Sequence, residues 1–547
     1  MPEWTIGAVL DAIADVVPDR LMTVCGDRRS TFAETAERTS RLASFLSRQG
    51  FGVHRPREEL DRWECGQDRV ALIMYNDLYP DMVIACLKAR VVPVNVNHHY
   101  SPREVHELLD YLRPRGIIYH RSLGNRFAEV LPPAGADVLV SIEDGSSAPR
   151  LPGAVSLDDA VSQGDTDYLP GSPDDLIMMC TGGTTGRPRG VLWRQSDMYV
   201  ASMTGADHAS VDEIHQKVRN EGRPWFAVSP LMHAAGMWTA FSAVLNGLTV
   251  VLYDDRDGFE AKSVWKTAER EKVGMLTMVG DAYASPLVAE LQRGSYDLSS
   301  LSAIGTGGAA TNPKYKRALM ECLPKITVID GYGSSESGNA GFGHSRCGTV
   351  SDTFALRPGG AVVSADRSRF LHPGEPEIGW VARTGRIPLG YFDDPEATER
   401  TFPEIAGQRV VIPGDRASLE KDGTIRLYGR DSQVVNTGGE KVFAEEVEEV
   451  LRAHPGVADA LVVGRPSERW GQEVVALVAR HPGADVDDTA LRAVCMSQLA
   501  RFKTPKAFLF VDEVRRLGNG KPDYRWAKQA ASQQIPNSTV LEGPYDS

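Results

Sequence analysis

The sequence has little of what defines a disulfide-rich, metal-binding or membrane protein. Its 547 residues include seven cysteines, none of them in a C-x-x-C pair or in a Cys/His cluster with the spacing of a zinc site. No run reaches the roughly 18 consecutive apolar residues of a membrane-spanning helix. Residues 1–17 have the pattern of an amphipathic helix and lack the basic start of a signal peptide. We therefore expect free thiols, a cytoplasmic location and no integral membrane segment.

The sequence also lacks an excess of positive charge. The chain has 60 Lys and Arg residues against 73 Asp and Glu residues, so its formal net charge is -13. This balance argues against a general nucleic-acid binder, and we expect no nucleic-acid partner. Any anionic ligand must therefore meet a local group of basic residues.

Short β-rich runs alternate with helical patterns along the first part of the chain, which predicts an α/β fold built from βαβ units. A charged segment at 53–68 interrupts this pattern and is interpreted as a surface insertion. The β-rich runs lie at 70–74, 91–94, 116–119 and 138–142, and a helical pattern lies at 102–112.

The pattern changes after residue 430. A helix at 444–453 and strands at 458–463 and 474–479 predict a compact α+β unit. A chain of this length exceeds what one hydrophobic core usually serves. We therefore predict two domains, 1–430 and 431–547, the first subdivided and containing a β-rich part, the second small and mobile.

Residues 180–190 read C-T-G-G-T-T-G-R-P-R-G and favour phosphate binding. Glycines present backbone N–H groups to an anion, threonines add hydroxyl donors and two arginines add positive charge. Apolar runs at 176–179 and 191–193 predict a loop between two strands. The spacing differs from that of a Walker P-loop, and an ordinary Gly/Thr/Pro hairpin loop is the alternative.

A second glycine cluster, G-T-G-G-A-A from Gly305, follows a strand-like run at 301–304 and precedes a predicted helix at 313–323. With Asp330 at the end of the next predicted strand, it imitates a dinucleotide-binding fingerprint. On these residues alone, a dehydrogenase and plain strand-turn-helix packing both stay open.

The sequence D-G-Y-G-S-S-E-S-G at 330–338 carries groups suited to different parts of ATP. Tyr332 could stack on adenine, Ser334 or Ser335 could donate to a phosphate oxygen, and Glu336 could hold Mg²⁺. The alternative is a polar loop around a core tyrosine.

Taken together and in this order, the motifs resemble those of acyl-CoA synthetases of the adenylate-forming superfamily, which includes luciferases and peptide-synthetase adenylation domains. Residues 181–190 resemble the family's T-S-G-T-T-G-x-P-K-G, and 332–336 resemble its Y-G-x-T-E. Further matches are P-L-M-H at 230–233 with Gly236, G-Y at 390–391, P-G-D at 413–415, G-R at 429–430, L-A-R-F-K-T-P at 499–505 and G-N-G-K at 518–521.

The resemblance implies two half-reactions with ATP, CoA and Mg²⁺. A carboxylate attacks ATP to give an acyl-adenylate and pyrophosphate, and the thiol of CoA then displaces AMP to give a thioester. No general base is needed, because a carboxylate is already ionised at neutral pH. The main task is to stabilise two anions that approach each other.

The resemblance also implies roles for single residues. Lys521 would bridge the carboxylate and the α-phosphate, Glu336 would anchor Mg²⁺, and His233 and Ser335 complete the expected catalytic set. Asp415 would accept the ribose hydroxyls. The expected ATP and AMP contacts are Thr181, Gly182, Gly183, Thr184, Thr185, Gly186, Arg189, Gly308, Ala309, Asp330, Gly331, Tyr332, Gly333, Ser334, Ser335, Asp415, Arg430 and Lys521, and the expected acyl pocket is His233, Ala234, Gly236, Gly308 and Gly338.

A rotation of the small domain is implied as well. Its hinge would be Ser432, where many relatives have Asp or Lys, and after rotation Gly438 and Gly439 would replace Lys521 and line a tunnel for the pantetheine arm. The sequence departs from the family's pattern at four further positions, none of which removes a group that the mechanism requires. These are Gly182 for serine, Arg189 for lysine, Ser335 for threonine and Pro413 for threonine.

The substrate is expected to be a hydrophobic carboxylic acid. The insertion at 55–68 and the segment 88–97 resemble actinobacterial ligases that activate side-chain acids derived from cholesterol, so a steroid acid is the first expectation. The alternative is a medium- or long-chain fatty acyl-CoA synthetase, or a fatty acyl-AMP ligase that acts on a carrier protein. A non-catalytic nucleotide-binding member is the hypothesis from another class. Partners are small molecules, and a homodimer stays open.

Overall fold

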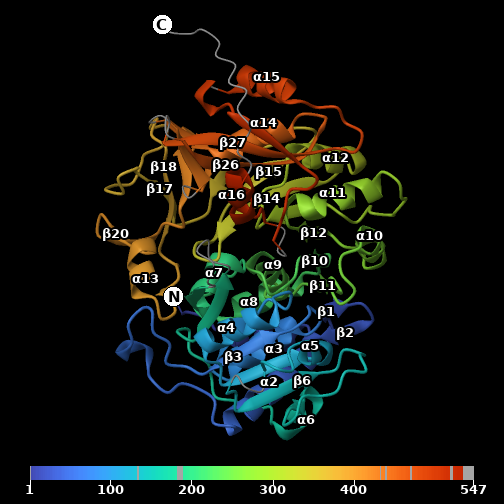
Figure 1. Cartoon of the computed structure of the whole chain (residues 1–547). Coiled ribbons are helices and arrows are strands. Elements are labelled where there is room, and N and C mark those ends of the chain that lie inside the picture. The colour runs from blue at the N-terminus through green and yellow to red at the C-terminus, as the bar shows by residue number, and fades with distance from the viewer. Residues whose placement is uncertain are drawn as a thin grey trace. The chain divides into compact units, whose positions relative to one another are not determined.

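A computed structural model of the protein describes residues 2–131, 135–181, 189–430, 433–437, 440–467, 471–499, 501–517 and 521–533. The chain divides into two compact units (Figure 1). The large unit comprises 1–413 with 418–425, and the small unit comprises 414–417 with 426–547. The chain crosses between them three times: just before β22 (Asp415–Leu419), within β22, and near the start of β23 (Thr424–Arg430).

An eight-stranded sheet forms the N-terminal part of the large unit, in the order β19-β9-β8-β4-β3-β5-β6-β7. Neighbouring strands from β8 through β4, β3, β5 and β6 to β7 are parallel, and β9 runs antiparallel to β8. The strands are β3 (Arg69–Ile73), β4 (Val92–Asn95), β5 (Gly116–His120), β6 (Val138–Ile142), β7 (Val155–Ser156), β8 (Leu176–Thr181), β9 (Arg189–Arg194) and β19 (Gly390–Tyr391).

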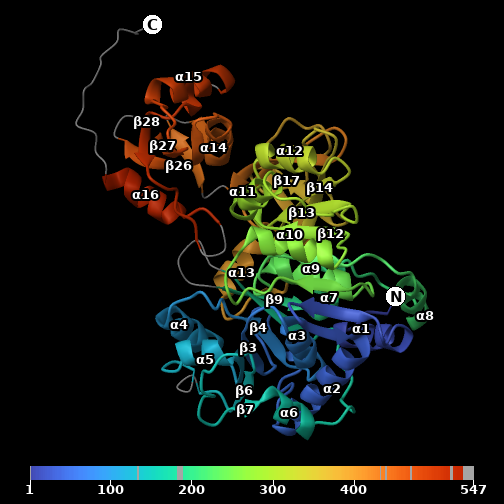
Figure 2. The ribbon, with the colours of Figure 1, turned by 90° about the vertical axis from the view of Figure 1, so that its right-hand side faces the viewer.

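Helices cover both faces of this sheet, as βαβ units require. Figure 2 shows α4 and α5 on one side of β3 and α1, α2 and α3 on the other. The side chains of β3 alternate accordingly, since Val70 and Leu72 join the core with α2 and α3, whereas Ala71 and Ile73 join the core with α4. The helices are α1 (Ile6–Val16), α2 (Phe32–Arg48), α3 (Tyr79–Lys88), α4 (Pro102–Leu112), α5 (Arg121–Arg126) and α6 (Leu157–Gln163).

Helix α4 shows how local sequence sets an element. Its N-cap Ser101 forms a capping box with Glu104, and Pro102 takes the first turn, where its missing N–H costs nothing. Its buried residues are Val105, Leu108, Leu109 and Leu112, spaced along one face. The helix predicted over 102–112 is confirmed with the same bounds.

The second sheet of the chain has 15 strands, and its first part, in the large unit, runs β2-β1-β11-β10-β12-β13-β14-β15-β16. It is parallel from β1 to β14 and antiparallel at β14–β15 and β15–β16. Side chains of α10, α11 and α12 pack into its core. The elements are β1 (Leu21–Cys25), β2 (Arg28–Thr31), α7 (Gln195–Ser202), α8 (Val211–Arg219), β10 (Trp225–Ala227), α9 (Ala234–Val244), β11 (Val250–Leu252), α10 (Ala261–Arg270), β12 (Met275–Met278), α11 (Gly280–Leu291), β13 (Ala303–Gly307), α12 (Pro313–Cys322), β14 (Thr327–Ser334), β15 (Gly338–Ser345) and β16 (Thr353–Leu356).

A β-rich part completes the large unit, as predicted. Strand β18 pairs antiparallel with β17 and β21, and β21 pairs with β20. The elements are β17 (Gly360–Val363), β18 (Gly379–Thr384), α13 (Pro395–Thr401), β20 (Glu404–Ile405) and β21 (Gln408–Val411).

The insertion at 53–68 is held together by contacts between its own residues. Val53 bridges to Gln67, and the Arg57 guanidinium donates to the carbonyls of Leu60 (2.5 Å) and Glu64 (2.9 Å). A half-buried cation therefore organises the loop from inside, which agrees with its interpretation as a discrete insertion.

The small unit is a sheet between two layers of helices. Along β27, Val474, Ala476 and Val478 pack with α14 and α15, whereas Val475 and Leu477 pack with α16. The predicted mixed α/β class, with a large domain of several sheets and a small α+β domain, is confirmed. The elements are β24 (Val434–Thr437), β25 (Glu440–Phe443), α14 (Ala444–Arg452), β26 (Val457–Ser467), β27 (Gly471–Arg480), α15 (Asp488–Gln498), β28 (Ala507–Val511) and α16 (Tyr524–Gln533).

Candidate functional site

The glycine- and threonine-rich loop lies between two antiparallel strands. Thr181 ends β8, Arg189 begins β9, and the two residues are paired in register. The prediction of a loop between strands, as opposed to one that opens a helix, is confirmed. Gly182, Gly183, Thr184, Thr185 and Gly186 lie outside the described residues.

One buried asparagine joins the base of this loop to the segment at 230–233. The side chain of Asn95, at the end of β4, accepts from Cys180 N (2.7 Å) and donates to Cys180 O (3.1 Å) and Met232 O (2.7 Å). Asn76 similarly accepts from Leu231 N at 2.8 Å. Neither asparagine was predicted as a site residue, although Asn95 ends a buried strand, where a polar side chain must find partners.

His233 is the N-cap residue of α9, and its N–H donates to Pro230 O at 3.2 Å. Three residues further on, a Cβ on Gly236 would lie 2.5 Å from Pro230 O, a distance that real contacts do not reach. Only glycine therefore lets the first turn of α9 approach the preceding segment. Close packing of the backbone explains this glycine without invoking room for an acyl group.

The cluster at 305–309 meets α9 in space. Gly308 has a left-handed backbone with φ of +75°, and a Cβ there would lie 3.4 Å from Ala235 Cβ and 3.6 Å from Val279 Cγ1. Ala309 packs against Gly280, which opens α11. The structure thus brings Gly308 beside Ala235 and Val279, and Ala309 beside Gly280, residues that are far apart in sequence.

Asp330 lies within β14 and not at the end of its strand, so that expectation was wrong. The strand continues to Ser334 and pairs Asp330 with Thr306. The Asp330 carboxylate accepts from Lys316 Nζ at 2.8 Å. Burial raises the pKa of Asp330, and the ammonium of Lys316 opposes this.

The segment from Gly331 to Gly338 forms the end of β14, a tight turn and the start of β15. Gly331 pairs with Gly307, and the Tyr332 ring lies 5.7 Å from that of Phe354. A Cβ on Gly333 would lie 2.1 Å from Gly338 O. Close approach of β14 and β15 accounts for Gly333.

Gly338 itself has a φ of +65°, and a Cβ there would lie 2.6 Å from Ser202 Oγ. Within the turn, Ser334 N donates to Ser337 Oγ and Ser337 N donates to Ser334 Oγ, at 3.0 and 3.2 Å. The hydroxyl of Ser334 therefore already closes the turn. As at Gly236, close packing explains the glycine at 338.

The Glu336 carboxylate and the Arg189 guanidinium meet at one tyrosine. The Tyr391 hydroxyl donates to Glu336 Oε1 at 3.0 Å, and the Arg189 guanidinium lies 5.4 Å from the centroid of the Tyr391 ring. Burial and the neighbouring Glu336 raise the pKa of Tyr391, so its hydroxyl stays protonated. Glu336, the expected Mg²⁺ ligand, and Arg189, an expected ATP contact from another motif, are thus brought together.

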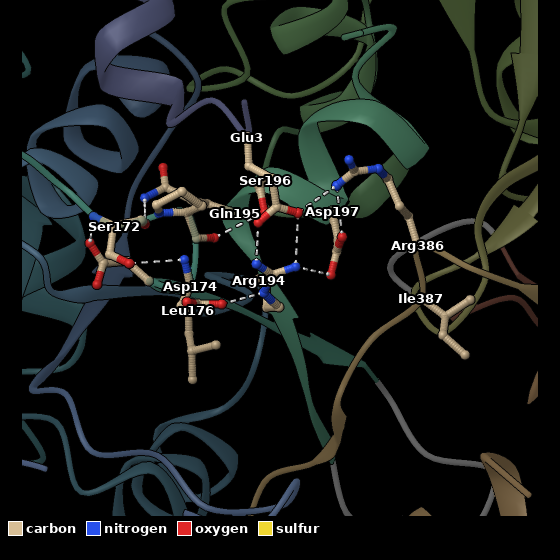
Figure 3. A network of polar contacts seen from close by, with 12 residues as sticks. Glu3, Ser172, Asp174, Leu176, Arg194, Gln195, Ser196, Asp197, Arg386 and Ile387 are labelled. Atoms are coloured by element: carbon tan, nitrogen blue, oxygen red, sulfur yellow. Dashed lines mark hydrogen bonds and ion pairs between the residues drawn. The ribbon is translucent and has the colours of Figure 1, made fainter. Parts of the chain in front are cut away.

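The far end of β9 is held by a network of ion pairs (Figure 3). Arg194 meets the carboxylates of Glu3 (2.5 Å), Asp174 (2.5 Å) and Asp197 (3.2 Å), and Arg386 shares Asp197 (3.0 Å) and Glu3 (3.2 Å). The free-energy cost of desolvating the two partly buried arginines is offset, because each guanidinium forms ion pairs with several carboxylates. The strand that leaves the candidate phosphate loop is therefore fixed at its other end.

A buried imidazole and carboxyl lie beside Asn76. His98 Nδ1 lies 3.0 Å from Met74 O, so the other ring nitrogen, Nε2, faces Asp255 Oδ2 at 3.8 Å. Burial lowers the pKa of His98 to about 3 and raises that of Asp255 to about 7. The pair is therefore a neutral imidazole beside a carboxyl group that holds its proton to neutral pH.

Asp255→Asn is expected to flatten the dependence of stability on pH. Burial raises the pKa of Asp255 in the folded state from 3.8 to about 7. Between these two pH values the folded chain therefore binds one proton more than the unfolded chain, and the free energy of unfolding of the wild type falls as the pH rises. The variant should gain about 3 kcal/mol relative to wild type between pH 5 and pH 8 in urea unfolding. The exposed neighbour Asp257, changed to Asn, is the control. Parallel slopes for Asp255→Asn and wild type would contradict this expectation.

The remaining predicted residues lie in the small unit. Asp415 begins β22, Arg430 ends β23, and Lys521 is exposed with its carbonyl accepting from Leu517 N at 2.8 Å. Ser432, Gly438 and Gly439 lie outside the described residues.

The fold and these motifs define an adenylate-forming enzyme. A model described as "AMP-binding enzyme" matches residues 10–353, and one described as "AMP-binding enzyme C-terminal domain" matches 446–521. The chain belongs to the AMP-binding enzyme family, so the expected superfamily is confirmed and the dehydrogenase alternative is excluded. Within the described residues, no helix has the length and hydropathy to cross a membrane.

Similar curated proteins match over nearly the whole chain. "Medium-chain acyl-CoA ligase Mig" of Mycobacterium avium is 44% identical over 96% of this chain and 98% of its own length. "Medium/long-chain-fatty-acid--CoA/3-oxocholest-4-en-26-oate--CoA ligase" of Mycobacterium tuberculosis is 37% identical over 94% of each chain. "3-oxocholest-4-en-26-oate--CoA ligase" of Rhodococcus rhodochrous is 34% identical over 96% of this chain and 95% of its own.

Solved structures share the fold. ATP-bound MatB from Rhodopseudomonas palustris has a TM-score of 0.80 at 21% identity, covering 96% of this chain and 99% of that one. The anthranilate CoA ligase AuaEII with anthranoyl-AMP also has a TM-score of 0.80, at 20% identity, covering 97% of this chain and 98% of that one.

Proposed function

We propose that the protein is an AMP-forming acyl-CoA ligase that converts a hydrophobic carboxylic acid, through its acyl-adenylate, to the CoA thioester. The observation that carries this proposal is the end-to-end similarity to CoA ligases, at 44% identity over 96% of the chain. The cluster of Glu336 and Arg189 around Tyr391 supports it, because a metal-bound triphosphate needs both a carboxylate for the metal and a cation for the phosphates.

Residues of each unit would have a task in adenylate formation. The loop that starts at Thr181 would grip the β- and γ-phosphates with N–H groups and hydroxyls, and Arg189 would add charge. Lys521 would neutralise the carboxylate and the α-phosphate as they approach. Asp415 would accept the ribose hydroxyls, and Arg430 would assist at the ribose and phosphate.

Glu336 fits a magnesium ion. Its carboxylate is a hard oxygen donor on a turn, partly exposed and oriented by Tyr391, as a Mg²⁺ ligand shared with phosphate oxygens requires. When bound, Mg²⁺ would neutralise charge on the triphosphate. The residues of the chain would orient the carboxylate, donate to phosphate and keep the adenylate from water.

A steroid side-chain acid and a fatty acid are both substrates of related ligases, by their names. We propose the steroid acid first and a medium- or long-chain fatty acid second. Transfer of the acyl group from the adenylate to a carrier protein is a further alternative. The enzyme would act in the cytoplasm, and a homodimer stays open.

A panel of carboxylic acids distinguishes these hypotheses about the substrate. Purified enzyme with ATP, Mg²⁺ and CoA is given steroid side-chain acids and fatty acids of several lengths, and AMP release and thioester formation are measured. Thioester with steroid acids at the highest kcat/KM supports the first proposal, and faster turnover of fatty acids supports the second. AMP release without thioester would contradict CoA ligation, and no AMP release with any acid would favour a non-catalytic member.

The two half-reactions require different residues of the small unit beside the reacting groups. We propose that the small unit turns about Ser432 after adenylation, which would withdraw Lys521 and bring Gly438 and Gly439 to the pantetheine path. Glycine there would leave room for a narrow tunnel.

A further inference from the structure

The side chain of Tyr391 is fixed on every side. It belongs to β19, where it pairs with Val191 of β9, the strand that leaves the candidate phosphate loop. Its N–H donates to Thr398 Oγ1 at 2.9 Å, and its ring packs edge-on against Phe402 at 5.8 Å. Only 5% of Tyr391 is exposed. The hydroxyl donates to Glu336 Oε1 at 3.0 Å, and the side chain of Thr401 also lies within hydrogen-bond reach of it.

The same ring supports a cation on its face. The Arg189 guanidinium lies 5.4 Å from the ring centroid, and Arg189 Nε lies 3.4 Å from Asp394 Oδ2. A guanidinium over an aromatic face is held by the ring quadrupole. Tyr391 thus contacts the two expected ATP-binding charges of opposite sign, the carboxylate through its hydroxyl and the guanidinium through its ring.

The backbone around Glu336 does not depend on Tyr391. Trp193 Nε1 donates to Ser335 O at 2.8 Å, and Arg383 Nη1 donates to Ser337 O at 2.8 Å and Asn339 O at 3.1 Å. The carbonyls on both sides of Glu336 are therefore held by other side chains. Loss of the Tyr391 hydroxyl would release the carboxylate and leave the turn in place.

We propose that Tyr391 is a positioning residue for the nucleotide site, which orients the Glu336 carboxylate and the Arg189 guanidinium toward metal-bound triphosphate. This inference rests on the proposed function and deepens it. It separates two roles within one side chain, since Tyr391→Phe removes the hydroxyl and keeps the ring that faces Arg189. The effect should appear for MgATP and not for AMP, because only the triphosphate carries the metal and the β- and γ-phosphates.

The test compares nucleotide binding by calorimetry in the full-length chain. Tyr391→Phe should weaken MgATP binding about tenfold, the usual loss for one hydrogen bond to a charged group, and raise the KM for MgATP similarly. AMP affinity, and conversion of supplied acyl-adenylate with CoA, should stay within about twofold of wild type. Tyr199→Phe is the matched control, a buried tyrosine whose hydroxyl lies 2.9 Å from His208 Nε2.

A double-mutant cycle with Glu336→Gln completes the test. If Tyr391 acts through the carboxylate, its substitution should change MgATP binding less than twofold in the Glu336→Gln background. Unchanged MgATP affinity in Tyr391→Phe, equal loss for MgATP and AMP, or a variant that fails to fold would each overturn the inference. Wild-type enzyme that forms no adenylate with any acid would instead count against the proposed function.

Discussion

Lys521→Ala is expected to reduce acyl-adenylate formation by about a hundredfold or more. The first half-reaction joins two anions, and removal of one preorganised charge that stabilises such a transition state typically costs 10²- to 10³-fold in rate. Lys521 is exposed, so the substitution should leave the fold intact. Pyrophosphate release with ATP, Mg²⁺ and acid measures this step.

The second half-reaction provides the internal control. Given synthetic acyl-adenylate and CoA, Lys521→Ala should form thioester at a rate within a few-fold of wild type, because that step needs no charge between a carboxylate and ATP. Lys528→Ala, on the exposed side of α16, should behave like wild type in both assays. Equal loss of both steps in Lys521→Ala would contradict a mechanism in which the small unit changes position between them.

Asp11→Ala is expected to be the most destabilising single change among the partners of Lys88. The Lys88 side chain is 0% exposed, and its Nζ lies 2.6 Å from Asp11 Oδ1, 3.0 Å from Ser40 Oγ and 3.3 Å from Ala36 O. Without Asp11 the ammonium stays buried with only neutral partners, which costs about 3–5 kcal/mol. Urea unfolding at pH 7 measures the loss.

Substitution of Lys88, the other member of the ion pair, should destabilise the fold less. In Lys88→Met the apolar stem is kept, and the carboxylate left behind is 35% exposed, so water can solvate it. We expect a loss of about 1 kcal/mol, and recovery of most of the Asp11→Ala loss when both residues are changed. The exposed Asp15→Ala on the same helix should stay within about 0.5 kcal/mol of wild type.

The pH dependence of the free energy of unfolding gives a second check of the role of Asp11. Burial lowers the pKa of Lys88 in the fold, and loss of Asp11 should lower it further. A base with a depressed folded pKa binds fewer protons in the fold than in the unfolded chain, so the stability of Asp11→Ala should rise with pH between 7 and 10. A loss of equal size for Asp11→Ala and Lys88→Met, without this slope, would contradict the asymmetry.

Elements with strong local signals were predicted well from sequence. The helical pattern at 102–112 predicts α4, and the apolar runs on both sides of the glycine-rich loop predict β8 and β9. The motifs are predictable for the same reason. In each motif the glycines that turn the backbone lie within a few residues of the polar side chains that bind the ligand.

Contacts between distant segments were not predictable in this way. Asn95 ties β8 to the segment before α9, and Lys316 takes the carboxylate of Asp330. A Cβ on Gly236 would meet Pro230 O and one on Gly338 would meet Ser202 Oγ, contacts that neither local sequence indicates. Each of these outcomes depends on which strands are adjacent, and the periodicity of one segment carries no information about that.

The sequence by itself determined the class of the enzyme, the order of its motifs and the residue types available for phosphate, metal and carboxylate chemistry, because these depend on short segments. Only the tertiary structure decided how these groups are held. Tyr391 reaches Glu336 because β19 pairs with β9, and that pairing brings together residues 55 positions apart in the chain. A charged side chain has a defined direction only when packed neighbours from other strands remove its alternatives.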